Sequence, residues 1–522
     1  MEVHEEMLIR DILEESEKKF SETVAVKWLK KKEIYEINYR EMMENVRAVR
    51  KGLSAEGFQE KHIALIGNSS VEWMEGYLGI ITGKAVAVPL DAMLTAEDLA
   101  DLINRSDSEA LFLSPKNGKI LEGILAECPN LKKIWLLQEE AAEFSDERVT
   151  SLGKLKEAGR ESEADSRQPE AGDTATIIFT SGTTGKSKGV MLTQENLASN
   201  VLSVDFAAEP GTVILSVLPI HHAFCLVMDW LKGFSLGATV CINDSLLHMV
   251  KNMGIFKPEM ILMVPLMVET IYKRLSAANP LIPKKLVAAK AFGGNLKMII
   301  TGGAHLDPFY IDKFADYGID IYEGYGMSEC SPVISANMPQ AHKAGSIGKP
   351  LSNVEISFED GEILVRGSSV MKGYYKMPKE TAEALQDGWL HTGDKGYLDE
   401  DGFLFMNGRI KNLIILSNGE NISPEEIENK LALGKLVGEV VVTGENNGLT
   451  ARIYPDQDVV SAKHMSEEKI RADLQAFLDK YNKSQPTYRQ ITGFVVRKYP
   501  FHKSTTKKIK RSEAMIDEPD GQ

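Results

Sequence analysis

The sequence predicts an α/β fold with a second, smaller α+β unit at its carboxyl end. A short apolar run at residues 62–66, a helix-spaced segment at 71–81 and another apolar run at 85–90 follow one another. Strand, helix and strand at this spacing favour a βαβ unit built on a parallel sheet. From about residue 410 the pattern changes to short strands and helices with apolar residues for a core of their own. At 522 residues the chain is long enough for several compact units.

Two further signals describe the larger unit. Residues from Met7 to Phe20 have the apolar spacing of an amphipathic helix. The stretch from Gly159 to Gly172 has almost no large apolar residue, which predicts an exposed linker. We find no internal repeat and no low-complexity tract.

The smaller unit contains its own helix and strand signals. Ser423 and Pro424 supply an N-cap and a first-turn proline for a helix. Residues 439–442 and 449–454 have the composition of two strands that flank an Asn-Asn-Gly turn. Two domains of unequal size often bind a ligand between them. The remaining predicted elements are a helix capped by Ser466 and a strand at residues 493–496.

Composition excludes some classes of function. The 60 basic and 75 acidic residues give a net charge of −15, which argues against sequence-independent binding of nucleic acid. The amino terminus lacks the basic-then-apolar order of a signal peptide, and no apolar stretch approaches the length of a membrane-spanning helix. We therefore expect a cytoplasmic protein and leave peripheral membrane contact open.

The four scattered cysteines predict reduced core or pocket residues: Cys128, Cys225, Cys241 and Cys330.

The most informative segment is a loop between two apolar strands. One strand (176–179) enters a run of Thr, Ser, Gly and Lys, and a second strand (190–192) leaves it. Glycines let backbone N–H groups close on an anion, hydroxyl groups donate hydrogen bonds, and Lys186 and Lys188 add positive charge. Such a loop suits a polyphosphate.

Other interpretations of this loop fit less well. A Walker A loop needs a glycine where this chain has Thr180, and a helix where it predicts a strand. Residues 185–189 match the letters of a nucleophile elbow, but that motif needs a strand-to-helix turn. A flexible Gly/Ser loop stays open as an alternative, although such loops are not normally bounded by two apolar strands.

The loop from Thr180 to Gly189 resembles the phosphate loop of the adenylate-forming (AMP-binding) superfamily, which includes acyl-CoA synthetases, carrier-protein adenylation domains and firefly luciferase. Five further segments resemble motifs of this superfamily in the same order, and within it the chain resembles bacterial long-chain fatty acyl-CoA synthetases. They are an adenine-side turn at 301–304, a Tyr-Gly-x-Thr-Glu-like motif at 322–329, a ribose segment at 388–394, a hinge at 408–412 and a lysine motif at 504–511.

The resemblance implies an architecture and a reaction. The implied architecture is a large N-terminal domain (1–408) of mixed α/β subdomains with a smaller β subdomain, a hinge (409–412) and a mobile α+β lid (413–522). In the implied reaction, a carboxylate attacks the α-phosphate of ATP to form an acyl-adenylate and pyrophosphate, and a thiol then displaces AMP. Cations and Mg²⁺ are expected to neutralise the negative charges that meet in the first step.

The resemblance also implies roles for particular residues around the nucleotide. Glu329 and Thr180 are the expected Mg²⁺ ligands, since hard cations prefer oxygen. Ser328 stands where the family usually has Thr and keeps the hydroxyl. Tyr325 would present an aromatic face to the nucleotide, and Asp394 would accept the ribose hydroxyls. Further expected nucleotide contacts are Ser181, Gly182, Thr183, Thr184, Lys186, Gly302, Gly303, Ala304, Glu323, Gly324, Gly326, Met327 and Arg409.

Structural roles explain several of the same residues. Glu329 could be a solvated loop carboxylate. Asp394 lies in a Gly-Asp-Lys-Gly run, where aspartate also favours turns. Tyr325 could be a core residue.

Two moving segments complete the implied site. Lys508 matches the lysine that reaches from the small domain to the reacting groups, although Lys507 stands where the common pattern has glycine. A disordered basic tail is the alternative interpretation. Lys411 matches the hinge, and Gly419 would allow a pantetheine arm to pass after rotation. A structural turn explains Gly419 as well.

One segment points to the class of acid. His222 matches the position that lines the junction of the acyl and pantetheine tunnels, and a core histidine is the alternative interpretation. Amino-acid-activating relatives carry Phe-Asp where this chain has Ala223 and Phe224, with Asp229 farther on, so an α-amino substrate is disfavoured. Three methionines suit either an acyl tunnel or a core: Met260, Met263 and Met267.

The expected function is an ATP-dependent acyl-CoA synthetase that uses Mg²⁺ and coenzyme A, and the expected acid is a fatty acid. The first alternative is an enzyme that loads the acyl group onto an acyl carrier protein. The second is a nucleotide-binding protein that has lost catalysis, which the presence of Glu329, Asp394, Arg409 and Lys508 disfavours. Luciferase-type oxidation also stays open.

Overall fold

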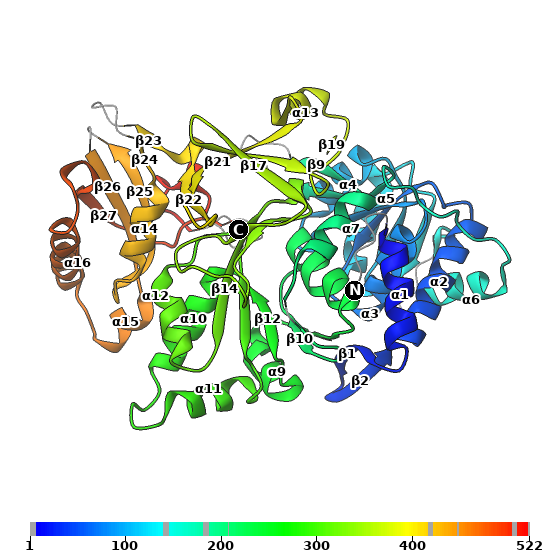
Figure 1. Cartoon of the computed structure of the whole chain (residues 1–522), viewed down its shortest axis with the longest axis horizontal. Coiled ribbons are helices and arrows are strands. Elements are labelled where there is room, and N and C mark those ends of the chain that lie inside the picture. The colour runs from blue at the N-terminus through cyan, green and yellow to red at the C-terminus, as the bar shows by residue number, and fades with distance from the viewer. Residues whose placement is uncertain are drawn as a thin grey trace.

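Two large sheets, a smaller β unit and a carboxy-terminal α+β unit make up the molecule (Figure 1). The two large sheets lie beside each other, and the carboxy-terminal unit lies at the far end of the long axis. The computed structural model describes residues 7–138, 146–180, 187–206, 208–415, 421–445, 448–503 and 509–519.

The eight-stranded sheet has the order β19-β9-β8-β4-β3-β5-β6-β7 and is parallel from β8 to β7. Helix α3 (Val71–Ile81) joins β3 (His62–Ile66) to β4 (Val86–Leu90), which confirms the predicted βαβ unit. Ser70 starts α3 by accepting a hydrogen bond from the backbone N–H of Trp73 at 3.1 Å. The other strands are β5 (Ser108–Leu113), β6 (Lys133–Leu136), β7 (Val149–Ser151), β8 (Thr174–Thr180), β9 (Lys188–Thr193) and β19 (Gly373–Tyr374). The helices around this sheet are α2 (Tyr39–Ala55), α4 (Ala96–Arg105), α5 (Leu121–Glu127) and α6 (Leu152–Glu161).

The nine-stranded sheet has the order β16-β15-β14-β13-β12-β10-β11-β1-β2. Its strands from β14 to β1 are parallel and mostly apolar, as expected for strands that helices cover on both faces. Its strands are β1 (Val24–Lys30), β2 (Glu33–Asn38), β10 (Val213–Ser216), β11 (Thr239–Ile242), β12 (Met260–Met263), β13 (Met298–Thr301), β14 (Asp320–Gly326), β15 (Val333–Ala336) and β16 (Lys349–Pro350). Its helices are α1 (Ile9–Phe20), α7 (Gln194–Ser203), a π-helical segment (Phe224–Leu231), α8 (Lys232–Ser235), α9 (Met249–Phe256), α10 (Pro265–Ser276), α11 (Lys284–Phe292) and α12 (Pro308–Ala315).

A five-stranded antiparallel sheet lies above the junction of the two large sheets in Figure 1. Its central strand β21 pairs with three neighbours, and β22 then leads into the carboxy-terminal unit. Its elements are β17 (Val354–Glu359), β18 (Glu362–Gly367), α13 (Pro378–Ala384), β20 (Leu385–Gln386), β21 (Trp389–Leu398) and β22 (Leu404–Arg409).

The carboxy-terminal unit has a buried core of its own, which includes Ile427, Leu431, Leu474 and Leu478. Every element predicted from its sequence is present, and Ser466 caps its longest helix by accepting a hydrogen bond from the N–H of Lys469. The elements are β23 (Ile414–Ile415), β24 (Asn421–Ile422), α14 (Pro424–Ala432), β25 (Val437–Glu445), β26 (Gly448–Pro455), α15 (Gln457–Ala462), α16 (Glu467–Asn482) and β27 (Ile491–Val496).

The prediction of an exposed linker at residues 159–172 is wrong for part of that stretch. Gly159 belongs to α6, and an added Cβ there would lie 1.8 Å from the backbone oxygen of Ala48. The buried Arg50 side chain then binds Asp165 through two hydrogen bonds of 2.7 and 2.9 Å. The ion pair with Arg50 holds this polar segment against α2, although the segment has almost no large apolar residue. Composition alone is therefore misleading here.

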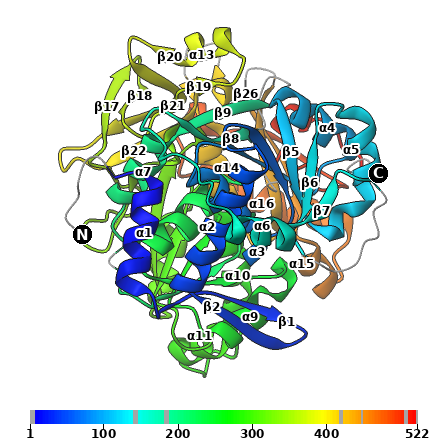
Figure 2. The same ribbon diagram turned by 90° about the vertical axis from the view of Figure 1, so that its right-hand side faces the viewer.

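The carboxy-terminal unit touches the larger domain through an ion pair. Lys273 Nζ on α10 lies 2.9 Å from Oδ2 of Asp456, the residue that caps α15. Figure 2, turned by 90°, shows α10 and α15 close together as well. Among the helices of the described residues, none is long and apolar enough to cross a membrane.

Candidate active site

Two glycine-rich turns meet where β13 and β14 end. Gly302 follows β13, and an added Cβ at this position would lie 3.1 Å from the backbone oxygen of Gly324. Gly303 has a φ of +81°, a conformation that favours glycine, and Ala304 after it is exposed. On the other strand, a Cβ at Gly326 would collide with the backbone oxygen of Pro332. The predicted adenine-side residues therefore lie together at the carboxyl ends of parallel strands, where ligands of such sheets bind.

Tyr325, Asp394 and Arg409 form one contact group that joins two sheets. The Tyr325 hydroxyl on β14 donates a 2.8 Å hydrogen bond to Oδ2 of the buried Asp394 on β21. Arg409 Nε on β22 lies 3.1 Å from the other carboxylate oxygen, and half of the Arg409 side chain is exposed. Burial and then the charge of Asp394 hold the pKa of Tyr325 well above its usual range. The phenol stays protonated, so it remains a donor that orients the carboxylate.

Glu323 is a buried carboxylate on β14 beside the same turn. It accepts a 3.0 Å hydrogen bond from the N–H of Leu306, and Nδ1 of His305 lies 3.2 Å from the same oxygen. Burial alone would lower the pKa of His305, but the hydrogen bond and charge of Glu323 outweigh it, so the pKa lies above its ordinary value. Asn337 donates to the backbone oxygen of Glu323 at 3.1 Å. These contacts fix the turn at 302–306 onto β14.

Glu329 lies beside the strands that carry the phosphate loop. The Tyr374 hydroxyl donates a 2.8 Å hydrogen bond to Glu329 Oε1, and Lys188 Nζ lies 4.6 Å from the centre of the Tyr374 ring. Tyr374 is on β19, which pairs with β9, the strand that leaves the loop. Burial and the charge of Glu329 raise the pKa of Tyr374. Glu329 is therefore a positioned, mostly buried carboxylate and not a solvated loop residue. Ser328 and Met327 stand just before it and are half-buried.

The middle of the phosphate loop lies outside the described residues, namely Ser181, Gly182, Thr183, Thr184 and Lys186. Its two ends are described. The Thr180 hydroxyl lies 3.5 Å from the backbone oxygen of Lys188, and β8 and β9 form an antiparallel pair between them. Thr180 pairs with Lys188, and Lys188 lies over the Tyr374 ring. The ends of the loop are therefore next to the Tyr374–Glu329 pair.

The donor set around Glu329 suits a metal that arrives with the nucleotide. Within the described residues, no three His, Cys, Asp or Glu side chains gather as a cluster that could hold an ion. Mg²⁺ typically binds through one or two carboxylates together with phosphate oxygens and water. A single oriented carboxylate beside a phosphate loop fits that pattern, and Thr180, whose hydroxyl faces a backbone oxygen, is a weaker candidate ligand.

The segment expected to border the acyl group, residues 218–224, leads into a π-helix (Phe224–Leu231). His222 precedes it, half-buried, with its ring centre 4.1 Å from that of His221. Inside the π-helix, Cys225 Sγ donates to Oδ2 of the fully buried Asp229 at 3.6 Å. Burial raises the pKa of Asp229 to about 7. This carboxyl is therefore only partly ionised at neutral pH and packs on its own helix.

Lys508 lies outside the described residues, but the segments on both sides of it are held firmly. Lys503 forms an isolated bridge with Ile509 and an ion pair with Glu439. After it, Arg511 forms an ion pair with Glu428 on α14. Burial raises the pKa of Glu428 to about 7, and Arg511 opposes this shift. The stretch that bears Lys508 therefore starts and ends on anchored points of the small domain.

The expected hinge joins β22 to the small domain. Gly408 has a φ of +115°, and an added Cβ would lie 2.3 Å from Ser423 Oγ. Asn412 donates a 2.6 Å hydrogen bond to Oε1 of Glu425 at the start of α14. Lys411 is exposed in the same turn. Gly419, the predicted pantetheine contact, lies outside the described residues.

Sequence reasoning missed Tyr374 and His305. Tyr374 is 45 residues from Glu329, and their contact depends on the pairing of β19 with β9, which no local pattern reveals. His305 follows the Thr-Gly-Gly-Ala turn directly, so its closeness to that motif was the available signal.

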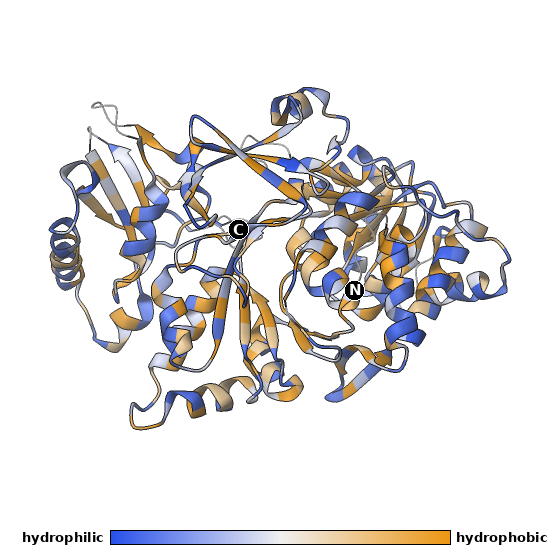
Figure 3. Cartoon of the chain, viewed as in Figure 1, coloured by the Kyte–Doolittle hydropathy of each residue, from blue (hydrophilic) through white to orange (hydrophobic). Residues whose placement is uncertain are grey.

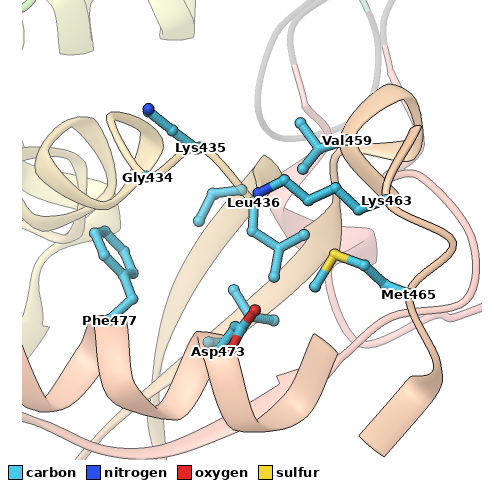
Figure 4. Close-up of a pocket in the computed structure, with 10 residues that line it drawn as sticks. Gly434, Lys435, Leu436, Val459, Lys463, Met465, Asp473 and Phe477 are labelled. Carbon is cyan, nitrogen blue, oxygen red and sulfur yellow. The ribbon is translucent and has the colours of Figure 1, made fainter. Parts of the chain in front are cut away.

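Two cavities lie away from these side chains. One, of about 200 Å³, is in the carboxy-terminal unit between α15 and α16, with Leu436, Met465 and Phe477 among its walls (Figure 4). The other, of about 210 Å³, lies beside α11. Neither cavity touches Glu329, Asp394 or His222, so the chemistry of the positioned side chains identifies the candidate site.

Comparisons with known proteins agree with this picture. A profile of the AMP-binding enzyme family matches residues 13–375, and one of the AMP-binding enzyme C-terminal domain matches residues 411–517. A Rattus norvegicus protein named long-chain-fatty-acid–CoA ligase 5 is 30% identical over 487 residues, which cover 81% of this chain and 71% of the relative. An Arabidopsis thaliana chloroplastic protein named long-chain-fatty-acid–[acyl-carrier-protein] ligase AEE15 is 27% identical over 579 residues, covering 90% and 79%.

The fold is shared with solved structures. The crystal structure of the anthranilate CoA ligase AuaEII in complex with anthranoyl-AMP aligns with a TM-score of 0.83 at 20% identity, covering 98% of each chain. That likeness concerns the fold, whereas the family profile spans more than half of the sequence. The chain belongs to the AMP-binding enzyme family, part of the adenylate-forming superfamily that its ordered motifs resemble.

Proposed function

We propose that the chain is an AMP-forming acid–thiol ligase that activates a fatty acid with ATP and transfers the acyl group to coenzyme A. One observation carries the proposal. Glu329 and Asp394, two carboxylates 65 positions apart in sequence, are each oriented by a buried tyrosine, Tyr374 on β19 and Tyr325 on β14. A nucleotide needs both kinds of group, one for its phosphates and one for its sugar.

In the first step, a carboxylate oxygen of the acid attacks the α-phosphorus, and the bond to the pyrophosphate oxygen breaks. Asp394, held by Tyr325, would fix the ribose hydroxyls, and the loop beyond Thr180 would hold the phosphates. Mg²⁺ bound with the nucleotide at Glu329 would supply charge neutralisation at the phosphates. Lys508 would bring an ammonium group to the same charges from the small domain.

In the second step, the sulfur of the thiol attacks the acyl carbon and gives up its proton to solvent, and AMP leaves with the electron pair of the acyl carbon–oxygen bond that breaks. The hinge at 409–412 and the domain boundaries 1–408 and 413–522 are part of the proposal. Rotation about this hinge would replace Lys508 by the segment containing Gly419. His222 would line the place where the thiol meets the acyl group.

The fatty-acid assignment rests on two supports. Relatives that cover most of the chain bear long-chain-fatty-acid names. In addition, Asp229 is fully buried against Cys225 of its own helix, so its carboxyl is not presented to the ammonium of an amino acid. A carrier-protein thiol is the second candidate acceptor, because the Arabidopsis relative is named for that acceptor.

A pyrophosphate-exchange panel tests the first step. Purified protein with ATP, Mg²⁺ and labelled pyrophosphate is supplied with straight-chain acids from acetate to palmitate. We expect exchange to rise with chain length, since each buried methylene contributes roughly 0.8 kcal/mol. AMP release with free coenzyme A is then compared with release by holo acyl carrier protein. If none of these acids drives exchange, a nucleotide-binding protein that has lost catalysis is favoured instead.

Replacing Asp394 tests the nucleotide site separately from the chemistry. Asp394→Asn keeps the shape and can still accept from Tyr325, but it loses the charge that hydrogen bonds to ribose would use. Such charged hydrogen bonds contribute roughly 1.5–3 kcal/mol, so we expect ATP to bind about 10- to 100-fold more weakly by calorimetric titration. The matched variant Tyr325→Phe should weaken binding less. Unchanged ATP affinity in Asp394→Asn would remove Asp394 from the nucleotide site.

A further inference from the structure

The segment that leads into α11 exposes large apolar side chains at one edge of the molecule. We call residues 279–290 the α11 corner. Leu281 is 88% exposed, Leu286 is 61% exposed and Ile282 is 45% exposed. Figure 1 shows this segment protruding at the lower left, and Figure 3 shows apolar colouring in its loop. Large apolar side chains that are exposed next to one another often mark an interaction surface.

The corner is also built to keep its shape. The N–H of Leu281 donates to the side-chain oxygen of Asn279 at 3.0 Å, and the N–H of Ile282 donates to the backbone oxygen of the same residue at 3.0 Å. Pro283 precedes the first residue of α11, and its backbone oxygen accepts from Leu286 at 2.9 Å. The three apolar side chains are therefore presented by a turn with fixed ends and not by a loose tail.

The charge around the corner is opposite to that of the whole chain. Residues 279–297 contain four lysines and no acidic residue, whereas the chain carries a net charge of −15. Two of the four lysines form ion pairs with acidic residues of neighbouring elements. Lys284 pairs with Asp316 at 2.7 Å, and Lys297 pairs with Glu259 at 2.9 Å. Asp320 lies on the adjoining strand, while Lys257, just after α9, and Lys313 on α12 add positive charge. Lys285 and Lys290 are exposed within the corner.

A cavity lies beside α11 as well. About 210 Å³ of space lies between α11 and the start of β14, with Phe292, Leu296 and Ile319 in its walls and Lys285 also lining it. Apolar surface with lysines at its margin is the pattern of proteins that lie on a lipid surface, because the apolar side chains enter the boundary layer while ammonium groups reach the phosphates.

We propose that the α11 corner docks the protein reversibly on an anionic lipid bilayer. Leu281, Ile282 and Leu286 enter the boundary between headgroups and acyl chains, and Lys285 and Lys290 face the lipid phosphates. The acidic excess elsewhere opposes a second contact, so attachment is confined to this corner and weakens as salt screens the lysines. This inference goes beyond the proposed function, and its test requires no catalysis.

Co-sedimentation with vesicles tests the docking surface. The full chain is mixed with vesicles of phosphatidylcholine alone or with phosphatidylglycerol added, at low and high salt. We expect binding to the anionic vesicles, at least about tenfold weaker for Leu281→Ser/Leu286→Ser because burial of the two side chains is lost. Lys285→Gln/Lys290→Gln should lower the binding and remove most of its salt dependence.

Met93→Ser is the matched control, since Met93 is an equally exposed apolar side chain on the eight-stranded-sheet side. It should bind vesicles as the unchanged chain does. All substituted side chains are exposed, and thermal unfolding of each variant checks that the fold is intact. No binding to anionic vesicles, or equal loss in the control and corner variants, would overturn the proposal. Capture of an acidic protein without any vesicle binding would do the same and would indicate a protein partner.

Discussion

Replacing Lys508 by alanine should lower acyl-adenylate formation by roughly 100- to 1,000-fold, as expected when a preorganised positive group is removed from developing negative charge. Transfer of the acyl group from a supplied acyl-adenylate to the thiol should change little, because the lysine would have left the site by then. Pyrophosphate exchange measures the first half-reaction, and thioester formation from synthetic acyl-adenylate measures the second.

Lys507→Ala provides the control for this experiment. The two lysines are neighbours in a segment whose ends are fixed by Lys503, Glu439 and Arg511, so the variants change the same local charge by the same amount. Loss confined to Lys508→Ala supports a specific reach to the reacting groups. If both half-reactions fall equally, Lys508 has no separate role in adenylation, and if Lys507→Ala alone is inactive, the neighbouring lysine has that role.

Glu329→Gln should reduce adenylation to a similar extent, about 100-fold or more, because the substitution removes the charge that would bind Mg²⁺ beside the phosphates. The shape is kept, and the amide oxygen can still accept from Tyr374. The diagnostic measurement is the Mg²⁺ concentration that gives half-maximal pyrophosphate exchange, which should shift upward at least about tenfold.

Tyr374→Phe separates positioning from metal binding. It removes the hydroxyl that holds Glu329 at 2.8 Å but leaves the carboxylate and the aromatic face above Lys188. We expect a loss of roughly 1 kcal/mol, less than about tenfold in rate, with a small change in Mg²⁺ requirement. A Mg²⁺ requirement that is the same in Glu329→Gln as in the unchanged chain would show that Glu329 does not bind the metal.

The sequence predicts local elements of this fold well because their signals are local. The βαβ unit around α3 and the helix capped by Ser466 depend on apolar spacing and capping residues that lie within a few positions of each other. The order of the strands in the sheets, by contrast, depends on residues that are far apart in the sequence. Pairing of β1 with β11 joins residues more than 200 positions apart, as the bond from Thr239 to the backbone of Val24 shows, and no pattern in either strand specifies its partner.

The candidate site divides in the same way. The glycines and carboxylates of the motifs are visible in the sequence, and their resemblance to a family indicates what to expect of them. The second partners are not visible, since Tyr325 reaches Asp394 across 69 residues and Tyr374 reaches Glu329 across 45. The clamp between Arg50 and Asp165 was missed for the same reason, because its two charges are 115 residues apart. Side-chain pairs between residues far apart in the sequence are therefore the part that sequence reasoning leaves out.

The ion pair between Lys273 and Asp456 adds little free energy to the orientation of the two domains. Lys273 is more than half exposed, and an exposed pair of this kind contributes at most about 1 kcal/mol. Breaking it changes the balance between two orientations by less than about tenfold. In the proposed rotation about the hinge, this pair would favour one orientation of the small domain and would break at a small cost in free energy.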